Sequence, residues 1–229
     1  MGKGRFEAFS DGVLAIIITI MVLELRVPHG ESLDALRPLL PVFLSYVLSF
    51  VNIGIYWNNH HHMLHTVQRV TGPILWANLH LLFWLSLMPF ATGWMGENHF
   101  AKVSVALYGV VLLMSGLAYK ILQETIIASQ GPLSLLKQAV GRDSKGWIPL
   151  VLYTSAIPLA FWFPWISLTF YVIVAALWLV PDKRIERVLE SKRISTVGGG
   201  SVGASPATPS LSRRTDEGTD GDTRRHTGD

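Results

Sequence analysis

Charged and polar side chains open the first long apolar stretch of the sequence. Arg5, Ser10 and Asp11 stand at its start, and a mostly apolar run follows them. A charge inside a membrane-spanning helix is costly, so it normally faces protein or water and needs a partner there. At 100° per residue, Asp11 points about 140° away from Ile16. We therefore expect Asp11 to face a neighbouring helix that supplies a cation or hydrogen-bond donors. A simpler interpretation stays open, in which Arg5 and Asp11 are ordinary helix-end charges.

Another face of the same helix is mainly apolar and excludes Asp11. Its members lie within about 60° of one direction on a helical wheel, and they are Arg5, Gly12, Ile16, Thr19, Ile20 and Leu23.

A histidine cluster offers a different kind of chemistry. His61 and His65 are separated by four residues, with His60 and His62 beside them. This spacing places two imidazoles on one helix face and is compatible with a zinc or nickel pair, or with a pH sensor. The sequence contains no His-Glu-x-x-His motif and no Cys, and solvated histidines are ordinary near a helix end. A divalent-metal membrane protein and a secondary cation transporter therefore stay as alternatives, and we expect no resident metal.

The composition limits what these side chains can do. Of 229 residues, 50% are hydrophobic and 15% are charged, and the mean hydropathy is +0.37. Such values argue against a soluble enzyme, a disordered chain or a coiled coil. No nucleotide-binding loop, catalytic triad or pair of acidic catalytic residues is visible, so we expect neither an enzyme nor a small-molecule substrate. The pI near 9.3 fits a membrane surface better than nucleic acid.

The elements that position these residues are predicted to be membrane-spanning helices. A span needs about 20 mostly apolar residues, and we expect an all-α membrane protein with six spans, at residues 6–26, 36–58, 73–95, 100–121, 147–163 and 165–181. Residues 122–146 are expected to form an interfacial linker between the fourth and fifth spans. Residues 1–190 form the predicted membrane domain. Residues 191–229 are rich in Gly, Ser, Thr, Asp and Arg, and we expect a disordered tail.

The distribution of Lys and Arg predicts the orientation. With the N-terminus in the cytoplasm, the inner segments up to residue 193 hold twelve Lys and Arg residues and the outer segments hold three. This positive-inside bias places both termini in the cytoplasm.

Three short motifs resemble the signature of the transmembrane protein 175 family, a group of potassium channels from endolysosomes and prokaryotes. Phe9-Ser10-Asp11 matches the first-helix motif, with Arg5 at the expected spacing. The second motif is similar to the family's Trp-x-x-His-His and comprises Trp57, His60 and His61. The third is similar to the family's third-helix pattern and comprises Asn78 with Leu87, Pro89 and Phe90. The resemblance covers about 180 residues, all of the chain except the tail.

The resemblance implies a homotetrameric potassium-permeable channel in a bacterial plasma membrane, in contact with lipid and without a cofactor. The family uses no Thr-Val-Gly-Tyr-Gly filter, and its first helix lines the pore. Its hydrophobic constriction lies five residues after the signature Asp, which is Ile16 here, with Ile20 and Leu23 continuing that face. Thr19 is then a polar lining residue. The expected network that supports the pore helix comprises Arg5, Phe9, Ser10, Asp11, Trp57, His60, His61 and Asn78. Glu24 and Glu31 are candidates to attract cations at the outer mouth, although both are also ordinary loop charges.

Overall fold

The computed structural model describes residues 2–131, 134, 136, 137 and 144–179, and every regular element in them is helical. The predicted tail at 191–229 lies outside the described residues, as do 180–190. A long first helix, α1, spans Lys3–Leu23, and a 3₁₀ helix, η1 (Leu33–Leu39), leads into α2 (Leu40–His65). The remaining helices are α3 (Gly72–Ser86), α4 (Met88–Glu97), α5 (Lys102–Gln130), α7 (Ser144–Leu159) and α8 (Pro164–Leu179).

Local sequence explains several helix boundaries. Prolines occupy the first turns of α2, α3 and α4, where the missing N–H has no intrahelical partner to lose. Gly131 ends α5 at a positive φ of 73°, a conformation that glycine adopts without a steric penalty.

Four helical segments are long and apolar enough to cross a membrane within the described part of the chain. They are Lys3–Leu23, Leu33–His65, Gly72–Glu97 and Lys102–Gln130. Helices α7 and α8 are apolar but shorter, with 16 residues each. The all-helical membrane class of the prediction is therefore confirmed, whereas the count of six spans stays a prediction.

Two of the predicted spans differ in detail from the helices. The span expected at 73–95 is interrupted at Leu87, because Pro89 has no N–H to continue the backbone ladder. The span expected at 100–121 continues to Gln130, so the prediction of a linker beginning at residue 122 is wrong for residues 122–130. Polar residues of this extension find partners in the bundle: the Gln130 side chain donates to the Thr66 carbonyl at 3.0 Å.

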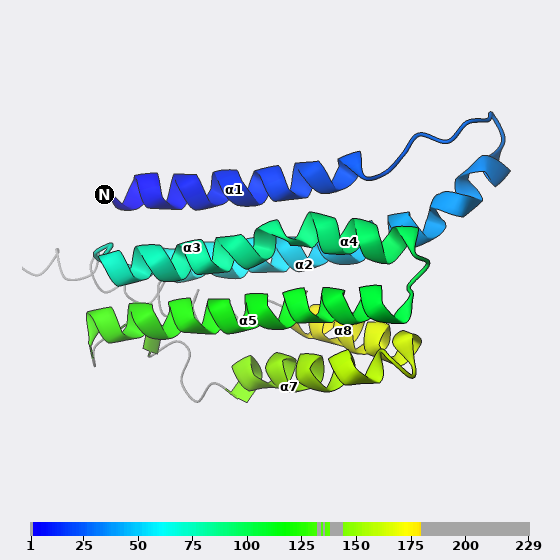
Figure 1. Ribbon diagram of the computed structural model, residues 1–229. Coiled ribbons are helices and arrows are strands. Elements are labelled where there is room, and N and C mark those ends of the chain that lie inside the picture. The colour runs from blue at the N-terminus through cyan, green and yellow to red at the C-terminus, as the bar shows by residue number, and fades with distance from the viewer. Residues whose placement is uncertain (1, 132–133, 135, 138–143, 180–229) are drawn as a thin grey trace, which may run out of the picture. The chain divides into compact units, whose positions relative to one another are not determined.

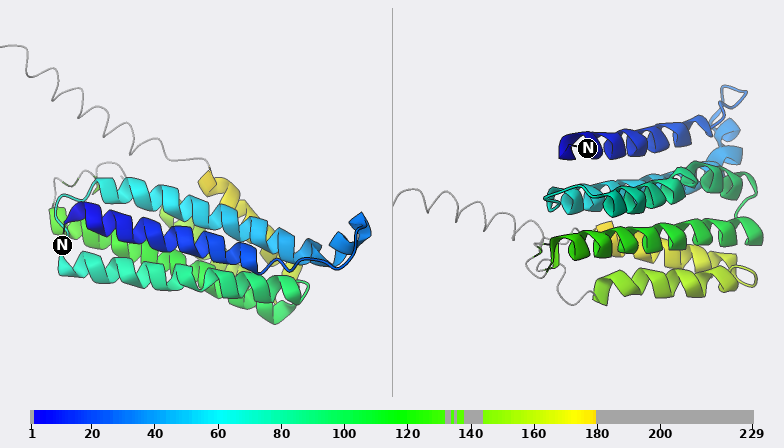
Figure 2. Two further views of the ribbon diagram at one scale, coloured as in Figure 1. Left: turned by 90° about the horizontal axis from the view of Figure 1, so that it is seen from above. Right: turned by 60° about the vertical axis from the view of Figure 1, so that its left-hand side comes forward.

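The helices run lengthwise beside one another, with α1 on one side of the bundle and α7 and α8 on the other (Figure 1). Helix α1 packs on α2, α3 and α4, whereas α5 packs on α3, α4, α7 and α8. The second view of Figure 2 shows the same order from α1 through α3 and α5 to α7. One side of α1 is thus fixed against the bundle, and its other side has no neighbouring helix among the described residues.

Candidate functional site

Helix α1 has a buried face and an exposed face. The buried face packs into the core, and it consists of Phe6, Ser10, Leu14, Ile17 and Met21. These residues follow the spacing of three and four that places side chains on one side of a helix. Because this face is anchored, the rotation of α1 about its axis is fixed, and so is the direction in which the opposite face points.

The predicted stripe lies on the exposed face. Ile16 is 57% exposed, Ile20 is 42% exposed and Leu23 is 77% exposed. Thr19 lies among them and donates its hydroxyl proton to the Ile16 carbonyl at 2.9 Å. The lone pairs of the Thr19 oxygen thus stay available to a cation. This arrangement can form a mostly apolar surface with one ring of oxygen ligands if copies of α1 face one another.

The polar residues of the buried face join three helices. Asn78 of α3 donates its amide to the Ser10 hydroxyl of α1 at 2.9 Å, and Ser10 donates in turn to the Phe6 carbonyl at 3.1 Å. The carbonyl oxygen of Asn78 lies 2.7 Å from Nε2 of His60 in α2. Because that oxygen only accepts, Nε2 of His60 carries the proton in this contact. All three side chains are at most 1% exposed, so one amide connects α1, α2 and α3 inside the bundle.

A second contact holds α1 to α2 through Asp11. The Trp57 indole N–H donates to Oδ1 of Asp11 at 3.1 Å. The Trp57 ring stacks on His61 with centroids 5.9 Å apart, and His61 lies 3.0 Å from His65 between their Nε2 atoms. His61 thus touches the signature carboxylate only through Trp57.

Arg5 and Phe9 lie outside both sets of contacts. Arg5 is exposed and has no hydrogen bond or ion pair with another described residue, and Phe9 is 48% exposed. Both stand on the outward-facing side of α1, where the described part of the protomer offers them no polar partner.

The opposite end of α1 approaches α4. The Glu24 carboxylate lies over Gly93, close enough that a Cβ at that position would be 3.1 Å from Oε2. Arg26 pairs with Glu97 at 3.0 Å. Glu31 is exposed in the following loop. Glu24 therefore sits at the end of the stripe beyond Leu23, whereas Glu31 is further along the chain.

The described residues contain no group of three or more histidine, aspartate or glutamate side chains arranged to hold a metal ion. Within the histidine cluster, His61 contacts His65 through their Nε2 atoms and meets the His62 ring edge-on, with centroids 5.8 Å apart.

Sequence reasoning missed a second buried polar chain. The Thr92 hydroxyl donates to the Met88 carbonyl at 2.6 Å and lies 2.6 Å from Ser49, which lies 3.0 Å from the Tyr108 hydroxyl. Since the Thr92 proton is already used, Ser49 donates to Thr92, and Tyr108 donates to Ser49. The only signal in the sequence is that these hydroxyls fall in the middle of predicted spans, and a single sequence does not indicate which of them meet.

Comparison with known proteins identifies the family. The family model described as endosomal/lysosomal potassium channel TMEM175 matches residues 5–89, the region that holds α1, α2 and α3. A curated potassium channel of Chryseobacterium sp. (strain P1-3) is 58% identical over 190 residues, which cover 83% of this chain and 99% of that protein. The human endosomal/lysosomal proton channel TMEM175 is 33% identical over 103 residues, which cover 40% of this chain and 20% of that protein.

The fold agrees with this assignment. The crystal structure of a lysosomal potassium-selective channel TMEM175 homolog from Chamaesiphon minutus matches with a TM-score of 0.69 and 28% identity, covering 79% of this chain and 97% of that chain. These relatives are named as channels and not as enzymes, which confirms the prediction that the protein is not an enzyme. With most of its length matched to one such channel, and with the family signature in place in α1, the chain belongs to the transmembrane protein 175 (TMEM175) family.

Proposed function

We propose that the protein is a potassium-permeable channel in which four copies surround a pore lined by α1. In this proposal all six apolar helical segments cross the plasma membrane, and both termini lie in the cytoplasm. Potassium is the permeant ion, and no cofactor is needed. The potassium channels among its relatives support the choice of ion.

The observation that carries the proposal is that one face of α1 is buried and the opposite face is exposed. Ile17 is 4% exposed, whereas its neighbour Ile16 is 57% exposed. Lipid can cover exposed apolar side chains, but here the exposed stripe also carries Thr19, whose oxygen is turned outward with its proton already bonded. Four such faces around an axis would bury the stripe and place the Thr19 oxygens around the ion path.

The proposed mechanism follows from the order of residues along that face. Four Ile16 side chains form a narrow apolar ring, which excludes water when it is tight and conducts when the helices move apart. Ions then meet a desolvation barrier at Ile16. The Thr19 oxygens, about one turn further along, replace part of the lost hydration. Ile20 and Leu23 continue the apolar wall.

The two contacts at the start of α1 set the width of this ring. Asn78 of α3 bonds to Ser10, and Trp57 of α2 bonds to Asp11, so α3 and α2 both fix the position of α1 close to the constriction. A small shift of α2 or α3 would move α1 and change the distance of Ile16 from the pore axis. Arg5 and Phe9 of the signature are free to contact a neighbouring copy.

The alternatives have less support. A secondary transporter does not explain why one helix leaves an apolar stripe uncovered. A divalent-metal protein needs more ligands than the two imidazoles of His61 and His65, and the described residues supply no third one in the cluster.

Reconstitution into liposomes tests the channel. We expect currents whose reversal potential follows a K⁺/Na⁺ gradient. Coupled uptake without single-channel events would support a transporter instead. Ile16→Asn should raise conductance and reduce the preference for K⁺ over Na⁺, because amide dipoles lower the desolvation barrier.

Ile17 offers a matched control for the position of the pore. The sequence has no Cys, so a single introduced Cys is the only thiol in the protein. Ile16→Cys should react with a charged thiol reagent in the open channel and block current, whereas Ile17→Cys should not react. Equal reactivity of the two variants would show that α1 does not line the pore as proposed.

A further inference from the structure

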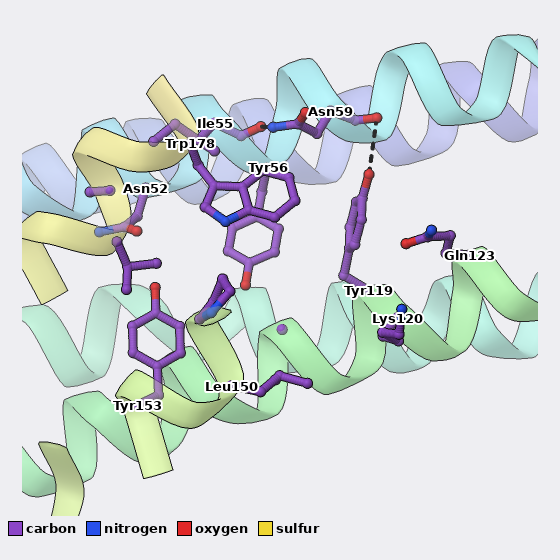
Figure 3. Close-up of a pocket in the computed structure, with 14 residues that line it drawn as sticks. Asn52, Ile55, Tyr56, Asn59, Tyr119, Lys120, Gln123, Leu150, Tyr153 and Trp178 are labelled. Carbon is purple, nitrogen blue, oxygen red and sulfur yellow. Dashed lines mark hydrogen bonds between the residues drawn. The ribbon is translucent and has the colours of Figure 1, made fainter. Parts of the chain in front are cut away.

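The last turns of α2 carry two histidines on a face that points away from α5. On the α5 side, Asn59 lines a mainly apolar cavity, and Tyr119 donates to its backbone carbonyl at 3.4 Å (Figure 3). At 100° per residue, His61 lies about 160° from Asn59 and His65 about 120° from it. His65 is exposed and His61 is half-buried, so water reaches this pair.

The two imidazoles meet at an angle. Their Nε2 atoms lie 3.0 Å apart and their ring centres lie 4.4 Å apart. A straight hydrogen bond between the two nitrogens would place the ring centres about 5.3 Å apart, and hydrogen bonds prefer angles above about 150°. Because the centres are closer than that, the rings are not in line. Two ligands of one metal ion are inclined to each other in this way.

The separation of the nitrogens selects the geometry of such an ion. With metal–nitrogen bonds of about 2.1 Å, nitrogens 3.0 Å apart subtend about 90° at the metal, and the ring centres then lie about 4.6 Å apart. A tetrahedral ion such as Zn²⁺ needs nitrogens about 3.4 Å apart. Cu²⁺ and Ni²⁺ bind imidazole and favour right-angled, tetragonal positions. The pair therefore fits these two ions better than zinc.

The neighbouring groups leave the pair accessible and bring little net charge to it. Lys3 donates from its Nζ to the His65 carbonyl at 2.9 Å, and Glu7 lies 3.8 Å from the same Nζ. One positive and one negative charge thus stand beside the site. His60 does not take part, because its Nε2 is bonded to Asn78 and its side chain is 1% exposed.

We propose that His61 and His65 bind one Cu²⁺ or Ni²⁺ ion reversibly through their Nε2 atoms, with water in the remaining positions. Each neutral ring then carries its single proton on Nδ1, so that both Nε2 lone pairs are free to bind. A resident metal site has three or four protein ligands, whereas this pair fills and empties with the concentration of the ion. The inference rests neither on ion conduction nor on membrane orientation.

Binding should also stiffen the contact that leads to α1. The ion joins two side chains one turn apart at the end of α2, and it fixes the ring of His61. His61 stacks on Trp57, whose N–H donates to Asp11 of α1. Backbone amides at residues 61–66 should therefore exchange hydrogen more slowly when Ni²⁺ is present.

Isothermal titration calorimetry of the full chain, prepared without a polyhistidine tag, tests the site with NiCl₂ as the probe. We expect His65→Gln to weaken binding about tenfold or more, which corresponds to about 1.4 kcal/mol. His62→Gln is the matched control, because His62 belongs to the same helical turn but meets His61 only edge-on. It should leave the affinity unchanged. MgCl₂ should not bind, since Mg²⁺ prefers oxygen ligands.

Hydrogen exchange of the native protein keeps the test decisive if His65→Gln folds poorly. Ni²⁺ should protect residues 61–66, and His61→Gln should remove that protection. No binding of Ni²⁺ by the native protein, or equal affinity of the native and His65→Gln proteins, would overturn the proposal. A preference for Zn²⁺ over Ni²⁺ would contradict the right-angled geometry. Ni²⁺ binding by a protein that passes no current would leave this inference standing and defeat the channel proposal.

Discussion

Replacing Asn78 by Leu tests the contact that joins α1 to the rest of the bundle. The Asn78 amide bonds to Ser10 of α1 and to His60 of α2, and it is 1% exposed. Leu has the same number of side-chain heavy atoms, branched at the same carbon, so the change removes the hydrogen bonds while keeping the shape at a modest increase in volume. Ser10 keeps its bond to the Phe6 carbonyl, but Nε2 of His60 is left unpaired, and Nδ1 of that ring already has no partner among the described residues.

The expected loss follows from two interhelical hydrogen bonds. Each such bond in a membrane protein contributes roughly 0.6–1.7 kcal/mol, so the free energy of unfolding should fall by about 1–3 kcal/mol. Asn58→Leu is the control, because Asn58 is a half-buried asparagine whose side chain makes no hydrogen bond with another described residue. That change should cost less than about 0.5 kcal/mol, as surface-like substitutions usually do.

The assay is a reversible titration of the protein from mild detergent into sodium dodecyl sulfate, followed by circular dichroism. A double-mutant cycle with His60→Leu then isolates the bond to Asn78. Removing both partners of a buried hydrogen bond costs less than the sum of the single removals, because no group is left unpaired. If the two losses simply added, or if Asn78→Leu matched the native stability within about 0.5 kcal/mol, the amide would not connect the helices as described.

Three other substitutions have defined outcomes. Gly96→Ala should cost about 1–3 kcal/mol in the same titration, because a Cβ there would lie 2.6 Å from the Val42 Cα; Gly12→Ala, with no atom within 4 Å, should cost far less, and equal losses would contradict this packing. Asp11→Ala should lower the yield of assembled channel on size-exclusion chromatography and leave the K⁺/Na⁺ reversal potential unchanged; normal yield with altered selectivity would place Asp11 in the pore. Thr19→Val keeps the side-chain shape but removes the oxygen, so single-channel K⁺ conductance should fall severalfold, and an unchanged conductance would exclude Thr19 as an ion ligand.

The helices were predictable from the sequence because an apolar run of about 20 residues indicates a membrane-spanning helix. The errors lie where polar residues are buried inside the bundle. Apolar and polar residues alternate irregularly after residue 121, which made that stretch look like an interfacial linker, yet Gln123 is buried and Gln130 bonds to Thr66. Pro89 was visible in the sequence, but whether it bends a helix or interrupts it depends on the backbone contacts around Leu87.

The contacts of the signature show a similar limit. The helical wheel indicates that Asp11 faces a neighbouring helix, but it does not choose among the donors there. Trp57 and His61 are one turn apart on the same helix, so only the relative rotation and height of α1 and α2 decide which of them meets Asp11. In the structure Trp57 donates the hydrogen bond to Asp11, and His61 stacks on the Trp57 ring instead.

The length of α5 has a consequence for the surrounding bilayer. At about 1.5 Å per residue, its 29 residues extend about 44 Å, whereas the hydrocarbon layer is usually about 30 Å thick. With α5 as a span, about 14 Å of the helix must project beyond that layer or be accommodated by tilt. Because hydrophobic mismatch costs a fraction of a kcal/mol per Å, lipids with short acyl chains should increase the tilt of α5.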